Sequence, residues 1–139
     1  MADRLKSNAV REKSYAFALN AIGLARLLRN NHEYELAGQL LRCGTSIGAN
    51  IEEAQSGISR PDFIAKMAIA SKEARETLYW LRLIRDARLL ADDQIAPRLR
   101  EVQELVRLLT AIVKTSQKSK SPQLKIQHSQ LNIVRRTDV

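Results

Sequence analysis

The sequence predicts an all-α protein, an up-down-up-down antiparallel four-helix bundle that carries a flexible basic C-terminal tail. Three observations predict this class: a composition dominated by Ala, Leu, Arg, Lys and Glu, few residues that break helices, and four segments with apolar residues at helical spacing. The chain of 139 residues has only five Gly and three Pro, and 45% of it is hydrophobic. This length suits a single core, so we expect the bundle over residues 1–117 and the tail over residues 118–139.

The first two helices are delimited by an Asn-rich break and a glycine. The first helix is expected from about residue 8 to residue 29, where Asn30 and Asn31 interrupt the pattern. Asn30 together with Glu33 is predicted to cap the start of the second helix. Gly57 is predicted to end that helix by adopting a left-handed conformation.

The third and fourth helices have start signals of their own. Ser59 is predicted to cap the third helix, and Pro61 suits its first turn. This helix should run to about Arg88, and Asp92 with Asp93 should start the fourth. Because the connections are short, neighbouring helices should be antiparallel.

The second helix places an amide on its apolar face. Its predicted core-facing series, in steps of four and three residues, is Leu36, Leu40, Cys43, Ile47, Asn50 and Ala54. A buried amide without partners costs about 1–3 kcal/mol. We therefore expect Asn50 to bond to the third helix, with Glu73 or Glu76 as partner, or to a neighbouring subunit. The full set of predicted buried polar residues is Ser46, Asn50, Glu53, Glu73 and Glu76, and Arg42 or Arg75 would join their network.

The fourth helix has more apolar surface than one core requires. One stripe comprises Ile95, Leu99, Val102, Val106, Leu109 and Val113, and a second comprises Leu105, Leu108 and Ile112. An apolar face beyond the core usually indicates association. The sequence therefore predicts self-association through this helix.

The net charge of +8 is distributed unevenly along the chain. The first 32 residues carry +4, residues 33–58 carry −3, and the tail carries +4. A basic protein of this kind favours a polyanion such as RNA or DNA, although the excess can also be ordinary solvated surface. The predicted phosphate-binding residues are Lys6, Arg11, Lys13, Arg26, Arg29, Arg82, Arg85 and Arg88. The last residues of the first and third helices should lie at one end of the bundle, which would bring Arg26, Arg29, Arg85 and Arg88 together.

The sequence offers little for catalysis, and we predict that the protein is not an enzyme. Its two histidines, His32 and His128, lie in a loop and in the tail, so no metal site or catalytic triad is expected, and no cofactor is predicted. The single cysteine, Cys43, falls on the apolar stripe and is interpreted as a core residue. Tyr79 and Trp80 are adjacent and should point in different directions; base stacking is an alternative role, but stacking sites usually lie on sheets or loops.

The chain is expected to be a soluble cytoplasmic protein with no membrane contact. It has no apolar run of 18 or more residues, and its first residues lack the apolar segment of a signal peptide.

Two motifs carry a resemblance to a known family. They are Ser46-Ile47-Gly48-Ala49-Asn50-Ile51-Glu52-Glu53-Ala54 and Lys72-Glu73-Ala74-Arg75-Glu76-Thr77-Leu78-Tyr79-Trp80-Leu81, with Asp62-Phe63-Ile64 between them. The chain resembles the bacterial four-helix-bundle proteins encoded within intervening sequences of 23S ribosomal RNA genes, and the accessory variability proteins of diversity-generating retroelements are similar in fold. The resemblance covers about residues 8–117, and Gly48 stands where many relatives have Pro.

The resemblance implies a homopentamer, a barrel of five bundles around a pore, and for some relatives nucleic-acid or reverse-transcriptase binding. Two hypotheses follow. The first is a non-enzymatic oligomeric bundle that binds nucleic acid through phosphate contacts. The second is a protein-interaction scaffold for a polymerase or another protein partner, which rests on the apolar face of the fourth helix and on Leu131, Ile133 and Val134 in the tail.

Overall fold

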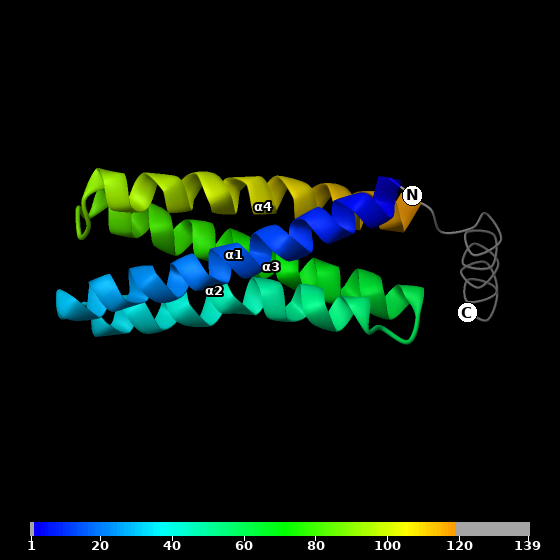
Figure 1. Ribbon diagram of the computed structural model, residues 1–139, viewed down its shortest axis with the longest axis horizontal. Helices are drawn as coiled ribbons and strands as arrows, with labels where there is room; N and C mark the ends of the chain where they lie inside the picture. The colour runs from blue at the N-terminus through cyan, green and yellow to red at the C-terminus, as the bar shows by residue number, and fades with distance from the viewer. Residues whose placement is uncertain (1, 119–139) are drawn as a thin grey trace, which may run out of the picture.

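A computed structural model describes residues 2–118 of the chain, and these residues form four α-helices. They are α1 (Ala2–Asn30), α2 (Tyr34–Gln55), α3 (Arg60–Asp86) and α4 (Asp92–Lys118). The helices lie side by side along the length of the molecule, and successive helices run in opposite directions (Figure 1). The predicted antiparallel four-helix bundle is therefore confirmed, while the predicted tail, apart from Lys118, lies outside the described residues.

The helices occupy the corners of a square. Each helix packs against the next one in the chain, and α1 packs against α4, whereas the diagonal pairs have no close backbone contacts. Helices α1 and α3 run in the same direction, so their last residues lie at the end of the bundle that holds the α1–α2 and α3–α4 connections (Figure 1). The start of α1 and the end of α4 lie at the opposite end.

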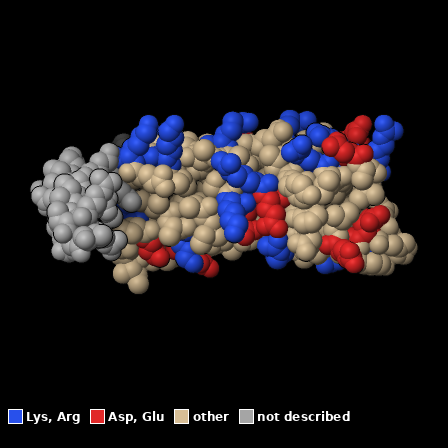
Figure 2. Space-filling view, turned by 180° about the vertical axis from the view of Figure 1, so that it is seen from behind, with Lys and Arg blue, Asp and Glu red and all other residues tan. Residues whose placement is uncertain are grey.

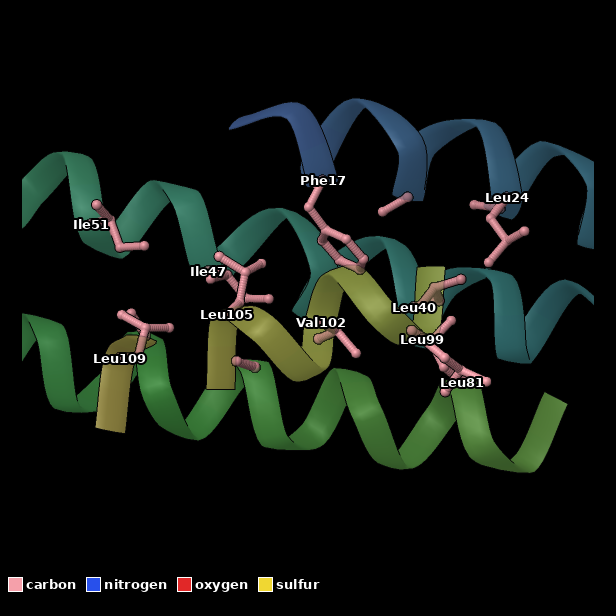
Figure 3. Packing of buried hydrophobic residues seen from close by; sticks show 14 of the residues in the cluster. Phe17, Leu24, Leu40, Ile47, Ile51, Leu81, Leu99, Val102, Leu105 and Leu109 are labelled. Atoms are coloured by element: carbon pink, nitrogen blue, oxygen red, sulfur yellow. The ribbon is translucent and has the colours of Figure 1, made fainter. Parts of the chain in front are cut away.

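A continuous apolar core runs the length of the bundle, and all four helices contribute to it. Figure 3 shows side chains from the four helices pointing toward one another in this core. The fully buried large side chains are Val10, Phe17, Leu28, Leu40, Ile47, Ile51, Met67, Leu81, Ile84, Ile95, Leu105 and Leu109. Their spacing of three and four residues along each helix is what places them on one face.

The ends of the helices follow the sequence signals only in part. The Ser59 hydroxyl accepts a hydrogen bond from Asp62 N at 3.3 Å, so the predicted cap of α3 is confirmed. Asn30 is instead the last residue of α1, and Glu33 precedes α2 without a side-chain capping bond. His32, with φ of 64°, supplies the left-handed residue that turns the chain, and Glu33 N donates to Leu28 O at 2.9 Å.

The end of α2 also differs from the prediction. Its C-terminal cap is Ser56, and no described glycine has a positive φ, so Gly57 does not supply a left-handed residue. Ser56 N donates to Glu53 O at 3.1 Å and Gly57 N donates to Ala54 O at 3.2 Å. Both bonds join residues three apart, so the last turn of α2 is tighter than an α-helical turn. Its terminal carbonyl groups accept these bonds, and a left-handed residue is not needed to satisfy them.

Asn50 does not make the predicted contact with α3. Its side-chain amide donates to Ser46 O at 2.9 Å and to Ser46 Oγ at 3.1 Å, both on its own helix. The side chain is half-buried, because Ile47 and Ile51 take the centre of the core-facing stripe. Ser46 is likewise half-buried, and Glu53 is exposed, so the prediction that these three residues are buried is wrong. An amide that is satisfied within one helix turn needs no partner from α3.

The second apolar stripe of α4 is part of the core. Leu105 and Ile112 are buried, and Val106, Leu108 and Val113 are half-buried against the core cluster. Because α4 contacts both α1 and α3, it uses a wider face than one packed on a single neighbour. The face that predicted self-association is therefore covered within the chain.

Candidate nucleic-acid interface

Two of the predicted phosphate-binding cations on α1 are held in ion pairs with other helices. Arg11 Nε lies 2.8 Å from Glu52 Oε1, and Lys13 Nζ lies 2.7 Å from Glu104 Oε1. These pairs join α1 to α2 and to α4. Both cations are exposed, but their charge is already balanced within the chain.

The arginines predicted to gather at one end of the bundle do so, but acidic residues accompany them. The cations at this end are Arg26, Arg29, Arg82, Arg85 and Arg88, and the carboxylates are Glu33, Glu35, Asp86, Asp92 and Asp93. Arg85 Nε lies 2.8 Å from Asp86 Oδ1, and this hydrogen bond lowers the pKa of Asp86. The carboxylates at this end therefore balance much of the positive charge of the arginines.

A cationic row that the sequence analysis did not single out lies on α4. Arg100, Arg107 and Lys114 follow one another at intervals of seven residues, which is two helical turns, and Lys118 follows one turn later. We call these four residues the α4 ridge. All four are exposed, and none has an ion-pair partner among residues 2–118.

The carboxylates of α4 that follow its first turn already have partners. Glu101 accepts from Asn20 Nδ2 at 3.3 Å and from Arg98 Nη2 at 2.7 Å, and Glu104 pairs with Lys13. Glu104 lies one turn from both Arg100 and Arg107, so it is a neighbour of the α4 ridge, but its charge is balanced by Lys13 of α1. The α4 ridge therefore keeps a positive excess.

The α4 ridge extends along most of one edge of the molecule. At 1.5 Å per residue, the distance from Arg100 to Lys118 is about 27 Å. Figure 2 shows Lys and Arg atoms along the upper edge, where α4 runs in Figure 1, with acidic atoms on this edge only near its right end. A straight row of fixed cations of this length matches a polyanion better than a small anion.

Helix α3 adds further cations beside the α4 ridge. Arg75 Nη2 donates to Thr110 Oγ1 at 3.2 Å, so Arg75 lies next to the stretch between Arg107 and Lys114. Because the two helices are antiparallel, Arg82, two turns further along α3, lies opposite Gln103, two turns back along α4. Arg82 was among the predicted phosphate-binding residues, whereas Arg75 had been considered only for a buried network.

Between α2 and α3 the structure holds a network of charged side chains. Arg42 pairs with Glu76 through Nη2, and its Nη1 lies 3.6 Å from Glu73 Oε2. Glu76 also accepts from Trp80 Nε1 at 3.4 Å. Glu73 and Glu76 are both half-buried, and their two carboxylates share the guanidinium of Arg42. These ion pairs connect α2 to α3.

Cys43 lies beside this network and is fully buried. Burial raises the pKa of its thiol, which keeps the thiol protonated near neutral pH. A protonated, inaccessible thiol is a poor nucleophile. The thiol therefore contributes packing between α2 and α3.

A surface hollow between α1 and α2 contains a carboxylate that is held in an ion pair. This hollow of about 460 Å³ is lined by Asn8, Arg11, Glu12, Tyr15 and Glu52. The hydrogen bond from Arg11 lowers the pKa of Glu52, so this carboxylate stays ionised, whereas a general acid needs a raised pKa. Residues 2–118 contain no group of three or more His, Cys, Asp or Glu side chains that could hold a metal ion. None of their helices is long and apolar enough to cross a bilayer.

Comparison with known proteins agrees with the fold and leaves the activity open. A family profile described as 23S rRNA-intervening sequence protein matches residues 6–111. A crystal structure of a protein of unknown function from the S23 ribosomal protein family of Bacteroides thetaiotaomicron is 42% identical, with a TM-score of 0.74 over 78% of this chain and 98% of that one. No curated protein matches the chain. With the matched region covering α2 and α3 in full and most of α1 and α4, this chain belongs to the family of 23S rRNA-intervening sequence proteins.

Proposed function

We propose that this protein is a non-enzymatic, self-associating helical bundle that binds nucleic acid through phosphate contacts on the α4 ridge. The observation that carries the proposal is the row Arg100, Arg107, Lys114 and Lys118, which is exposed, rigidly spaced and unpaired among the described residues. Cations fixed on a helix neutralise phosphates and release counterions. Cations that follow one another along a helix face contact phosphates, which carry no sequence information, so binding should not depend on sequence.

Self-association is proposed through a face other than the one the sequence suggested. Tyr15, Leu19 and Ile22 are exposed on α1 at intervals of four and three residues, and the side chain of Leu19 is 56% exposed. Such a stripe supports association between copies, and the resemblance implies a homopentamer. Five copies of the α4 ridge would strengthen the positive field. A monomeric mass of 15.7 kDa in native mass spectrometry would contradict this part of the proposal.

The triple variant R100Q/R107Q/K114Q tests the proposed interface. We expect it to bind a labelled duplex RNA about tenfold more weakly or worse than wild type at about 50 mM salt, because three phosphate contacts are lost. Fluorescence anisotropy gives the dissociation constants. All three side chains are exposed, so the variant should keep the melting temperature of wild type.

The matched control is R26Q/R29Q/R88Q, which removes the same charge from the end of the bundle where carboxylates balance the arginines. We expect its affinity to remain close to wild type. Equal losses in the two variants would show that only the total charge matters, and a loss confined to the control would return the interface to the end predicted from the sequence.

The alternative function, a scaffold for a protein partner, was predicted from two observations, and the structure no longer favours the first of them. The apolar face of α4 on which it rested is covered by α1 and α3. Its other support, the apolar residues Leu131, Ile133 and Val134, lies outside the described residues. Nucleic-acid binding is therefore the function that the described surface favours.

A further inference from the structure

Tyr79 lies on the outer surface of α3 between two arginines of that helix. Arg75 precedes it by four residues and Arg82 follows it by three, which makes both of them its neighbours on the helix surface. The side chain of Tyr79 is 53% exposed. The ring is not part of the bundle core. The neighbouring residues of α3 that face the core are Thr77 and Leu81, two positions before and after Tyr79.

The ring of Tyr79 is held in place by its neighbour Trp80. The two rings meet edge to face, with centroids 5.3 Å apart and an interplanar angle of 74°. Trp80 is half-buried, and its Nε1 donates to Glu76, which in turn pairs with Arg42. The contact with Trp80 restricts the side-chain rotation of Tyr79, so the Tyr79 ring has less conformational freedom than an isolated exposed tyrosine.

The charges around Tyr79 favour a nucleotide. Arg75 uses one nitrogen to bond Thr110, which leaves other donors of its guanidinium available. Glu76, the acidic neighbour one turn before Tyr79, is engaged by Arg42. The hydrogen bond from Arg85 lowers the pKa of Asp86, and Arg82 adds only a smaller electrostatic contribution. A cation therefore flanks the ring on each side along α3, and the α4 ridge continues the positive surface on the neighbouring helix.

We propose that Tyr79 is a stacking platform for an unpaired base, with Arg75 and Arg82 binding the phosphates on either side of that nucleotide. This inference rests on the proposed nucleic-acid binding and adds the class of ligand, a single-stranded segment. In a duplex the faces of the bases are covered by their neighbours, so a stacking ring gains nothing there. Aromatic rings beside cationic grooves bind single strands in this way, without regard to sequence.

Substitutions at Tyr79 separate stacking from phosphate binding. We expect Y79A to weaken binding of the full chain to an oligouridylate of about 20 nucleotides by roughly 5-fold to 150-fold for one stacked base. Binding to a duplex RNA of the same length should be unchanged. Y79F and Y79W keep a ring and should bind the single strand as wild type does. Trp80 is the only tryptophan, so its emission should change when the oligouridylate binds to wild type and not when it binds to Y79A.

The control is Y34A, which removes another exposed tyrosine, one that lies at the start of α2 beside Glu33 and Glu35, on a helix without close backbone contacts to α4. It should bind both ligands as wild type does. Unchanged single-strand binding in Y79A, or an equal loss on single strand and duplex, would overturn the stacking role while leaving phosphate binding intact. A change in the mass of the Y79A assembly would show that the Tyr79 ring lies in a contact between copies, which would also overturn the stacking role. Wild type that bound neither ligand would instead refute the proposed function itself.

Discussion

Replacing Phe17 with Ala is expected to lower the free energy of unfolding by about 3–5 kcal/mol. Phe17 is 2% exposed and points from α1 into the interior of the bundle (Figure 3). Its removal would leave a cavity in the middle of the core, where long helices on every side cannot collapse to fill it. Urea unfolding followed by circular dichroism measures the change, and the melting temperature should fall by about 10–20 °C.

Ile58, in the connection between α2 and α3, provides the control for Phe17. It is 100% exposed, so I58A should change the free energy of unfolding by less than about 0.5 kcal/mol. If F17A and I58A had similar effects, Phe17 would not lie in the core, and the arrangement of the helices described above would be incorrect.

Replacing Gly44 with Leu is expected to push α1 and α2 apart. A Cβ atom at Gly44 would lie 3.0 Å from Ala21 Cβ and 3.5 Å from Phe17 Cε1, and the rest of a leucine has no room between them. Overpacking of this kind costs about 1–3 kcal/mol, and more where the backbone must move. We expect a loss near the upper limit, because Ala21 Cβ is attached directly to the α1 backbone and cannot rotate out of the way.

Gly38 offers a control on the same helix. A Cβ atom at Gly38 would meet nothing within 4 Å, and the residue is exposed. G38L should therefore gain up to about 1 kcal/mol from the higher helix propensity of leucine. Thermal melting of the two variants should give shifts of opposite sign, and two shifts of the same sign would contradict the close approach of α1 and α2 at Gly44.

The fold could be predicted from the sequence because the strongest signals are periodic. Apolar residues at Ile95, Leu99 and Val102 recur with the helical repeat, and Ser59 with Pro61 marks a helix start by local chemistry alone. The conformations of the turns between the helices were harder to predict from the sequence. The chain reverses at His32 and Arg88, which adopt left-handed conformations with φ of 64° and 57°. Non-glycine residues are uncommon in that region, and although histidine is enriched there, arginine is not, so the residue types indicated the two turns only weakly.

The candidate interface was missed because the sum of charges along a segment says nothing of which charges are already paired. Residues 92–117 carry no net charge, so the distribution of charge along the sequence does not indicate a phosphate-binding site there. In the structure Glu101 and Glu104 bond to side chains of α1, whereas Arg107 and Lys114 are exposed. The seven-residue spacing of Arg100, Arg107 and Lys114 was visible in the sequence and would have indicated the row. The prediction for Asn50 is wrong because its amide is satisfied within its own helix, by the carbonyl and hydroxyl oxygens of Ser46.

The salt dependence of binding tests the central claim most directly. The logarithm of the association constant of the full chain for a duplex DNA, plotted against the logarithm of salt concentration, should fall linearly with a slope of about −0.9 for each phosphate neutralised. The slope for R100Q/R107Q/K114Q should be shallower by about three than that of wild type, because three phosphate contacts are absent. A wild-type affinity that does not respond to salt, or a slope that the triple variant leaves unchanged, would contradict phosphate binding by the α4 ridge.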